Sequence, residues 1–170
     1  MIRFFLLYIL AFSCALLFSY HAPEVSKLVF QEVLSAFIAL VMIVGTSSFA
    51  LYTYVEGVAK DVSSDTDKKL AAGYDSAVAS LSSLKKEILV NAFTVIALLL
   101  IEKCAHGIAV LFESSGYTYF NWPWAVFSSI RIACFTLSAY VAVVQFLGFI
   151  VANELRETLH KSALCLITQP

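Results

Sequence analysis

The sequence predicts an all-α protein, a four-helix transmembrane bundle with a cytoplasmic helical extension between the second and third spans. Hydrophobic residues make up 61% of the 170 residues and charged residues 14%, whereas soluble globular proteins are about half apolar and about a quarter charged. The mean hydropathy of +0.86 reflects long stretches that lack charge. A soluble monomer cannot bury so much apolar side chain, so we expect the excess to face lipid.

Four apolar stretches are long enough to cross a membrane, which takes about 20 residues in a helix. These stretches cover about residues 3–20, 30–54, 88–112 and 124–152. The first follows Arg3, as the apolar part of a secretory signal would, but Tyr20 and Ala22 match a cleavage site poorly. We therefore expect a retained first span and a single membrane domain over residues 1–170.

Lysine and arginine are distributed unevenly between the two sides of the predicted bundle. The two loops at 21–29 and 113–123 hold only Lys27, whereas the termini and the loop after the second span carry most of the others. Basic residues resist translocation, so we expect both termini, the helical connector at 56–87 and the tail at 153–170 to be cytoplasmic. The predicted location is a bacterial inner membrane that the chain crosses several times.

The connector is predicted to form a helix from about residue 66, because Ser64, Asp65 and Thr66 can each cap a helix. Apolar residues then recur at alternating steps of four and three, which is the spacing of one helix face. We expect this seam to bind a soluble cytosolic partner or further copies of the chain, and the alternative is a solvated connector. The seam consists of Leu70, Tyr74, Ala77, Leu81 and Leu84.

The second span continues the same alternation past the predicted membrane, which favours an antiparallel hairpin with the connector helix. The helical arm at 66–87 is longer than the arm at 55–63 by about 20 Å, at a rise of about 1.5 Å per residue. We therefore expect the longer helix to bend, to lie along the lipid headgroups or to pack its seam on another chain.

Five ionisable residues lie within the predicted spans, where an unpaired charge costs several kcal/mol. Glu102 lies near the centre of the third span, and Arg131 can extend toward it from the fourth. We expect a neutral polar cluster in the outer half of the bundle, with the lipid bilayer around it. The predicted cluster consists of Glu32, Glu102, Lys103, His106 and Arg131.

The cluster has three interpretations from the sequence alone. Glu102 and His106 are four residues apart, as some metal-ligand pairs are, but the spans offer no third ligand, so we expect no metal. A structural network of ion pairs and hydrogen bonds and a role in gating or ion passage both stay open. Lys103 faces about 100° away from Glu102 on a helix and is expected to point to a neighbouring subunit.

The fourth span carries three pairs of small residues spaced by four, which permit close helix approach in lipid. We expect this span to make the closest helix contacts of the bundle. Asn91 and Gln145 lie in the inner halves of the third and fourth spans, where a hydrogen bond between helices is expected. The small pairs are Ser129 and Ala133, Ser138 and Ala142, and Gly148 and Ala152.

The sequence contains no nucleophile beside a base at motif spacing, no cofactor fingerprint and no phosphate-binding glycine loop. We therefore expect neither enzymatic activity nor a cofactor. The net charge of −1 gives no basic footprint, so we expect no direct binding to nucleic acid.

The span order, the lysine-rich stretch between Tyr54 and Glu87 and the charged tail beginning Asn153-Glu154-Leu155-Arg156 resemble a class of four-span membrane proteins. These are the small membrane proteins of bacterial phage exclusion and defence, such as the membrane component of the Kiwa system and the lambda Rex membrane protein. The resemblance is one of topology, and no functional residue is carried over from it. It implies a membrane sensor that oligomerises and holds a soluble effector at the inner face.

Together, these observations predict an oligomeric, non-enzymatic membrane subunit. We expect it to sense or scaffold at the inner membrane and to recruit a soluble cytosolic partner. The alternative is an ion-conducting pore or a holin-like protein, which the charges at membrane depth favour.

Overall fold

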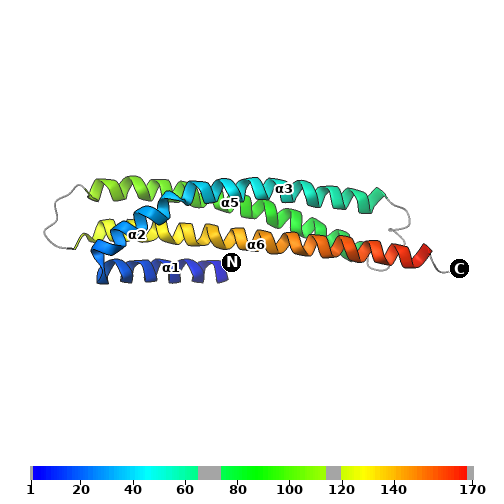
Figure 1. Ribbon diagram of the computed structural model, residues 1–170, viewed down its shortest axis with the longest axis horizontal. Helices are drawn as coiled ribbons and strands as arrows, with labels where there is room; N and C mark the ends of the chain where they lie inside the picture. Colours follow the sequence, from blue (N-terminus) through cyan, green and yellow to red (C-terminus); the bar gives the residue numbers. More distant parts are fainter. Residues whose placement is uncertain (1, 65–73, 114–119, 168–170) are drawn as a thin grey trace. The chain divides into compact units, whose positions relative to one another are not determined.

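The computed structural model describes residues 2–64, 74–113 and 120–167, and nearly all of these residues are helical, with no strand among them (Figure 1). The predicted all-α fold is confirmed. The helices are α1 (Ile2–His21), α2 (Pro23–Ser35), α3 (Phe37–Ser64), α5 (Tyr74–Glu113) and α6 (Trp122–Ile167).

Four helical stretches are long and apolar enough to cross a membrane. Only 17% to 28% of the residues in their most apolar windows are buried, so most of their apolar side chains face outward. Such a surface is favourable in lipid and unfavourable in water, and the chain is therefore a multi-pass membrane protein. The stretches are Ile2–His21, Pro23–Lys60, Val78–Glu113 and Trp122–Glu154.

The loop expected at 21–29 is wrong, because α2 begins at Pro23 directly after α1. Proline suits the first position of a helix, where its missing N–H leaves no hydrogen bond unmade. Along α2, Ser26, Phe30 and Leu34 are buried at steps of four, so one face of this helix packs on the protein. The charged residues Glu24 and Lys27 lie between the first two apolar stretches, which led to the prediction of a loop. In the structure both are exposed on the outer face of α2.

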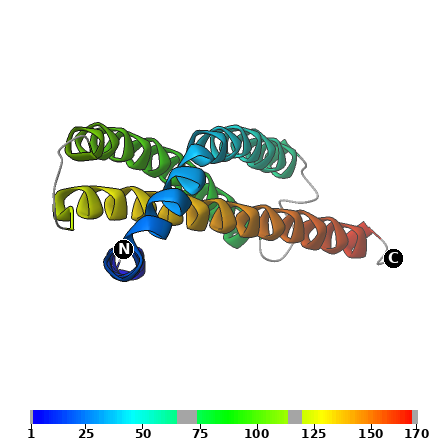
Figure 2. The same ribbon diagram turned by 60° about the vertical axis from the view of Figure 1, so that its left-hand side comes forward.

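A break at Ala36 separates α2 from α3. The backbone N–H of Ala36 donates to the carbonyl of Val33 at 3.3 Å, which is the tighter pattern of a 3₁₀ turn. The Ser35 hydroxyl also donates to the carbonyl of Glu32 at 2.7 Å. Figures 1 and 2 show the result, because α2 runs obliquely from the end of α1 to the start of α3.

The chain divides into two compact units. Unit 1 comprises residues 1–44 and 94–141, and unit 2 comprises residues 45–93 and 142–170. Helices α3, α5 and α6 each contribute residues to both units. The single membrane domain expected over residues 1–170 stays a prediction.

In unit 1, α1 and α2 pack on α6. Phe30 and Leu34 of α2 join Ala15 of α1 in a buried cluster, and Trp124, Ile132 and Phe135 of α6 pack against it. A second cluster joins α5 to α6 and receives side chains from the first half of α1. Its buried members are Leu98, Cys134 and Leu137.

In unit 2, α3 packs against α5, and this packing confirms the predicted hairpin. The cytoplasmic location of the hairpin stays a prediction. The helix start predicted near residues 64–67 lies mostly outside the described residues, which end at residue 64 and resume at residue 74. Ser64 itself is the last residue of α3. The buried members of the hairpin cluster are Leu51, Val55, Val58, Leu81, Ile88 and Ala152.

The seam expected to bind a partner is partly used within the chain. Leu81 is only 1% exposed, and Leu84 packs against the hairpin cluster, so this part of the seam is covered within the chain, and binding of a partner by the seam stays a prediction. This apolar face of α5 packs against residues of α3 and α6. Leu70 and the side chains of Tyr74 and Ala77 lie outside the described residues.

The small residues of the fourth span lie at buried helix contacts, as predicted. Ser129, Ala133, Ser138 and Ala152 are all 0% exposed. The expected bond between Asn91 and Gln145 is not formed, because Gln145 Nε2 donates to Ser48 Oγ at 2.7 Å instead. The predicted tail at 153–170 continues α6 as far as Ile167.

Candidate functional site

A fully buried carboxylate is the centre of the candidate site in unit 1. Glu102 of α5 is 0% exposed. Arg131 of α6 donates from Nε to Oε1 of Glu102 at 2.8 Å, and its own side chain is 14% exposed. A charge out of water needs such a partner, because the desolvation penalty is several kcal/mol for each ion. The two helices are therefore joined by a charge-assisted hydrogen bond.

Lys103 supplies the second cation beside this carboxylate. Its Nζ lies 3.1 Å from Oε2 of Glu102, at ion-pair distance but without hydrogen-bond geometry. Lys103 thus pairs with the carboxylate of its own chain, and its expected contact with a neighbouring subunit stays a prediction. Its backbone does face away from Glu102, but its long flexible side chain reaches back to the carboxylate. We call Glu102, Lys103 and Arg131 the Glu102 cluster.

Glu32 does not belong to the Glu102 cluster. It is exposed on α2 and forms no ion pair within the part of the chain that the structure describes. Because α2 buries the face of Phe30 and Leu34, a residue two positions from each lies on the opposite face. The expected neutral cluster is therefore wrong, and one carboxylate faces two cations.

His106 lies one turn beyond Glu102 on α5 and lines a cavity beside the Glu102 cluster. Its Nδ1 is buried and has no hydrogen-bond partner among the described residues. The structure thus brings together four of the five residues that the sequence singled out, the exception being Glu32.

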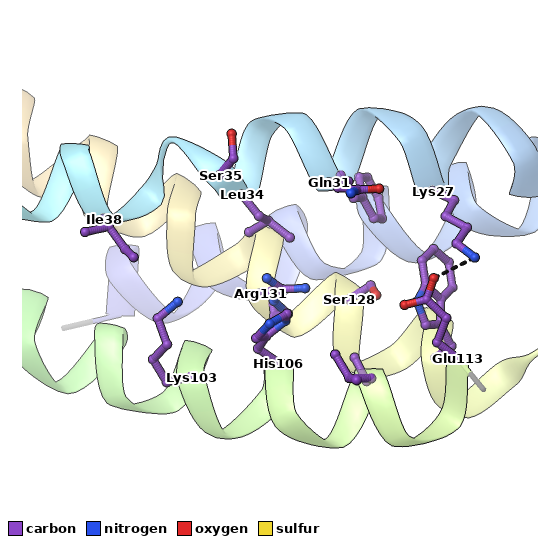
Figure 3. Close-up of a pocket in the computed structure, with 14 residues that line it drawn as sticks. Lys27, Gln31, Leu34, Ser35, Ile38, Lys103, His106, Glu113, Ser128 and Arg131 are labelled. Carbon is purple, nitrogen blue, oxygen red and sulfur yellow. Dashed lines mark ion pairs between the residues drawn. The ribbon is translucent and has the colours of Figure 1, made fainter. Parts of the chain in front are cut away.

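The cavity has a volume of about 340 Å³ and lies between the α2–α3 segment, α5 and α6, all within unit 1. Figure 3 shows Lys103, His106 and Arg131 in this space, with Lys27 and Glu113 at one end. We call it the unit 1 cavity. Its polar lining residues are Lys27, Gln31, Ser35, Lys103, His106, Glu113, Ser128 and Arg131.

Lys27, Gln31 and Glu113 also line the site, although they were not predicted as site residues from the sequence. Lys27 was assigned to the loop expected at 21–29, whereas Gln31 lies inside the second predicted span and was not singled out. Their spacing of four, parallel to the spacing of Ser26 and Phe30, is the signal of a helix with one polar edge.

A second, wider hollow of about 550 Å³ adjoins the unit 1 cavity and shares three lining residues with it. We call it the vestibule. Lys27 Nζ and Glu113 Oε1, 2.6 Å apart, form an ion pair at the boundary of the two spaces. The shared residues are Lys27, Glu113 and Trp124.

An apolar cluster closes the site on the side away from the vestibule. Leu98 lies one turn before Glu102 on α5, and Cys134 lies about one turn after Arg131 on α6. Leu137 completes the buried members of this cluster.

No protein-family model matches this chain, and neither a curated protein nor a solved structure matches it. The resemblance to four-span phage-defence proteins therefore stays a prediction. Within the described ranges, no group of three or more histidine, cysteine, aspartate or glutamate residues could hold a metal ion.

Proposed function

We propose that this chain is a non-enzymatic, multi-pass subunit of a bacterial inner membrane that senses a signal and acts with a soluble cytosolic partner. The observation that carries the proposal is the buried Glu102, paired with two cations beside a polar cavity inside helices that can span a membrane. Both termini and the hairpin of unit 2 are assigned to the cytoplasm, on the lysine and arginine distribution.

The energetics of buried charges support a sensing role for this cluster. Replacing a buried ion pair by apolar residues of similar volume is often neutral or stabilising, so Glu102 and Arg131 are a poor choice for holding helices together. Ionisable residues inside membrane spans commonly mark ligand, ion or proton sites. We therefore assign the Glu102 cluster to function and not to stability.

The partner surface is assigned to the polar face of α5 in unit 2, because the apolar seam is used by the hairpin. Ser76, Ser83, Lys86 and Glu87 are exposed on this helix. Glu102 lies on the same continuous helix, which provides a physical link from the sensing site to the partner surface.

Quantitative crosslinking in cells tests the partner. The full-length chain is compared with Lys86→Glu, and with Glu32→Gln as a control on an exposed residue of unit 1. We expect a defined cytosolic protein to crosslink to the chain and to Glu32→Gln, and to be lost from Lys86→Glu. Equal recovery of the same proteins with all three chains would contradict the recruitment proposal.

We place this activity in antiphage defence on the topological resemblance. A bacterial host that expresses the chain with its neighbouring genes should plate one or more phages less efficiently than the host alone. We expect Glu102→Gln to lose this protection and Glu32→Gln to keep it. Full protection by Glu102→Gln would show that the Glu102 cluster is not needed for protection against phage.

We also propose that the chain oligomerises. The Lys103 side chain is 46% exposed within a candidate span, so half of a charged side chain needs either water or another subunit around it. Native mass spectrometry of the full chain in detergent measures the subunit number. A monomer at all concentrations would contradict this proposal.

The alternative, an ion-conducting pore, has less support. The buried Leu98, Cys134 and Leu137 lie about one to two turns from Glu102 and Arg131 on the same helices, and apolar side chains beside the charges disfavour the wet path that a pore needs. Conductance in planar bilayers that changes in Glu102→Gln would favour the pore.

A further inference from the structure

The guanidinium group of Arg131 has donors that the protein leaves unused. Its Nε donates to Glu102 at 2.8 Å, and this is its single hydrogen bond within the described residues. The two terminal Nη groups are thus unpaired on a side chain that is only 14% exposed. The Nη groups are not among the fully buried unpaired atoms, so they reach the open space of the cavity that Arg131 lines, and a guanidinium fork matches the oxygen pairs of phosphate and carboxylate groups.

Two further nitrogen groups face the same space. Lys103 and His106 line the unit 1 cavity together with Arg131, as Figure 3 shows. The buried Nδ1 of His106 has no partner in the described part of the chain. Arg131 Nε and Lys103 Nζ contact opposite oxygens of the Glu102 carboxylate, so these two cationic side chains flank Glu102 and both line the cavity.

The charge around the cavity is also unbalanced. Lys27, Lys103 and Arg131 face the two carboxylates of Glu113 and Glu102, which leaves an excess of one positive charge with His106 neutral. An uncompensated charge in a membrane span is costly, and a bound monoanion would balance it.

We propose that the unit 1 cavity binds a phosphate group, held between the Nη groups of Arg131 and the Nζ of Lys103. The phosphate is either part of an anionic phospholipid or free in solution. The cavity volume of about 340 Å³ holds a phosphate with a small headgroup. This inference deepens the proposed sensing role and rests on it for the biological meaning of the ligand.

The surroundings provide access for such a ligand. The vestibule shares Lys27 and Glu113 with the cavity, and their side chains are 54% and 42% exposed, so this ion pair can open at the boundary. Phe30, Leu34 and Ile38 form an apolar part of the cavity wall that suits the glycerol and upper acyl carbons of a lipid.

The test measures thermal unfolding of the full-length chain in phosphatidylcholine nanodiscs. One arm adds phosphatidylglycerol to the bilayer, and the other adds inorganic phosphate to the buffer at constant ionic strength. At about a hundredfold excess over Kd, we expect a rise in Tm of roughly 5 °C in at least one arm. A rise with phosphatidylglycerol alone identifies a lipid, and a rise with inorganic phosphate identifies a free ligand.

The decisive variant is Arg131→Lys, which keeps the positive charge beside Glu102 but removes the Nη fork. We expect it to lose the ligand-dependent rise in Tm. The control Lys60→Gln removes an exposed cation in unit 2 and should keep the rise. Lys103→Gln is a second variant at a half-exposed position, and it should lose at least half of the rise even if Arg131→Lys does not fold.

The proposal is overturned if neither ligand raises Tm, or if Arg131→Lys and Lys103→Gln respond as the wild type does. These results are independent of partner recruitment, which is measured by crosslinking of Lys86→Glu. Failure of one proposal is therefore distinguishable from failure of the other.

Discussion

Arg131 and Glu102 lie 29 positions apart in the sequence, yet Nε of the first is 2.8 Å from Oε1 of the second. The bond joins α5 to α6 inside unit 1, at a carboxylate that is fully buried. Removing one partner leaves the other as a buried charge with less compensation. Removing both partners leaves no buried charge of this pair that needs compensation. This difference provides the first prediction.

Arg131→Met should destabilise the chain by about 3–5 kcal/mol, because Glu102 then retains only the Lys103 ion pair. The double variant Glu102→Met with Arg131→Met should recover most of this loss, since neither charge is then buried. Reversible unfolding in mixed micelles measures both free energies. Equal destabilisation by the single and the double variant would show that the pair is not the cause.

The hydrogen bond from Gln145 to Ser48 should contribute little to stability. Both residues are nearly fully buried, but hydrogen bonds between membrane helices average about 0.6 kcal/mol. A double-mutant cycle with Gln145→Leu and Ser48→Ala should therefore give a coupling free energy of about that size. A coupling above about 2 kcal/mol would mark this bond as part of a larger network.

Gly148 should tolerate alanine far better than valine. A Cβ at this position would lie 3.2 Å from Cδ1 of Leu84, so alanine needs only a small shift of that side chain. We expect Gly148→Val to cost about 1–3 kcal/mol because the extra methyl groups overpack the contact. Unfolding measurements should show that Leu84→Ala restores part of the loss, and no restoration would place the strain elsewhere.

Leu81 should be a stability residue of the hairpin. Leu81→Ala removes a side chain that is 1% exposed and should cost about 2–5 kcal/mol. The neighbouring Ser83→Ala alters an exposed side chain and should change the unfolding free energy by less than about 0.5 kcal/mol. If Leu81→Ala unfolds like the wild type, the hairpin packing does not hold in the membrane.

The assigned orientation predicts which positions a membrane-impermeant maleimide can label in intact cells. In a cysteine-free background, Glu24→Cys should react from outside, whereas Ser76→Cys should react only after the inner membrane is opened. Both residues are exposed, so a failure to react is due to the membrane and not to burial. The reverse pattern would place the termini outside.

Much of the fold follows from local properties of the sequence. The length and hydropathy of the apolar stretches predicted the four spans, because the cost of unpaired backbone in lipid leaves only helices. The pairing of Glu102 with Arg131 was predicted for a similar reason, because a charge buried in a membrane span is stabilised by an opposite charge at a similar depth. The small residues of the fourth span likewise indicated where helices approach closely.

Other features depend on contacts between distant segments. Nothing local distinguishes the outer face of α2 from a loop, and Lys103 reaches Glu102 through side-chain torsions that helical spacing does not specify. The spacing of Leu81 and its apolar neighbours is the same whether this face contacts another chain or α3 and α6 of the same chain. In the structure Leu81 packs against α3 and α6 of its own chain.

Hydropathy and helical period are properties of residues that are close in the sequence. The amino-acid sequence was therefore enough to establish a helical membrane protein with charges that need partners. Which partner each buried group meets depends on distances through space. The arrangement of α2, α5 and α6 therefore decided that Glu32 stays outside the cluster and that Arg131, with two Nη groups unpaired, lines a cavity.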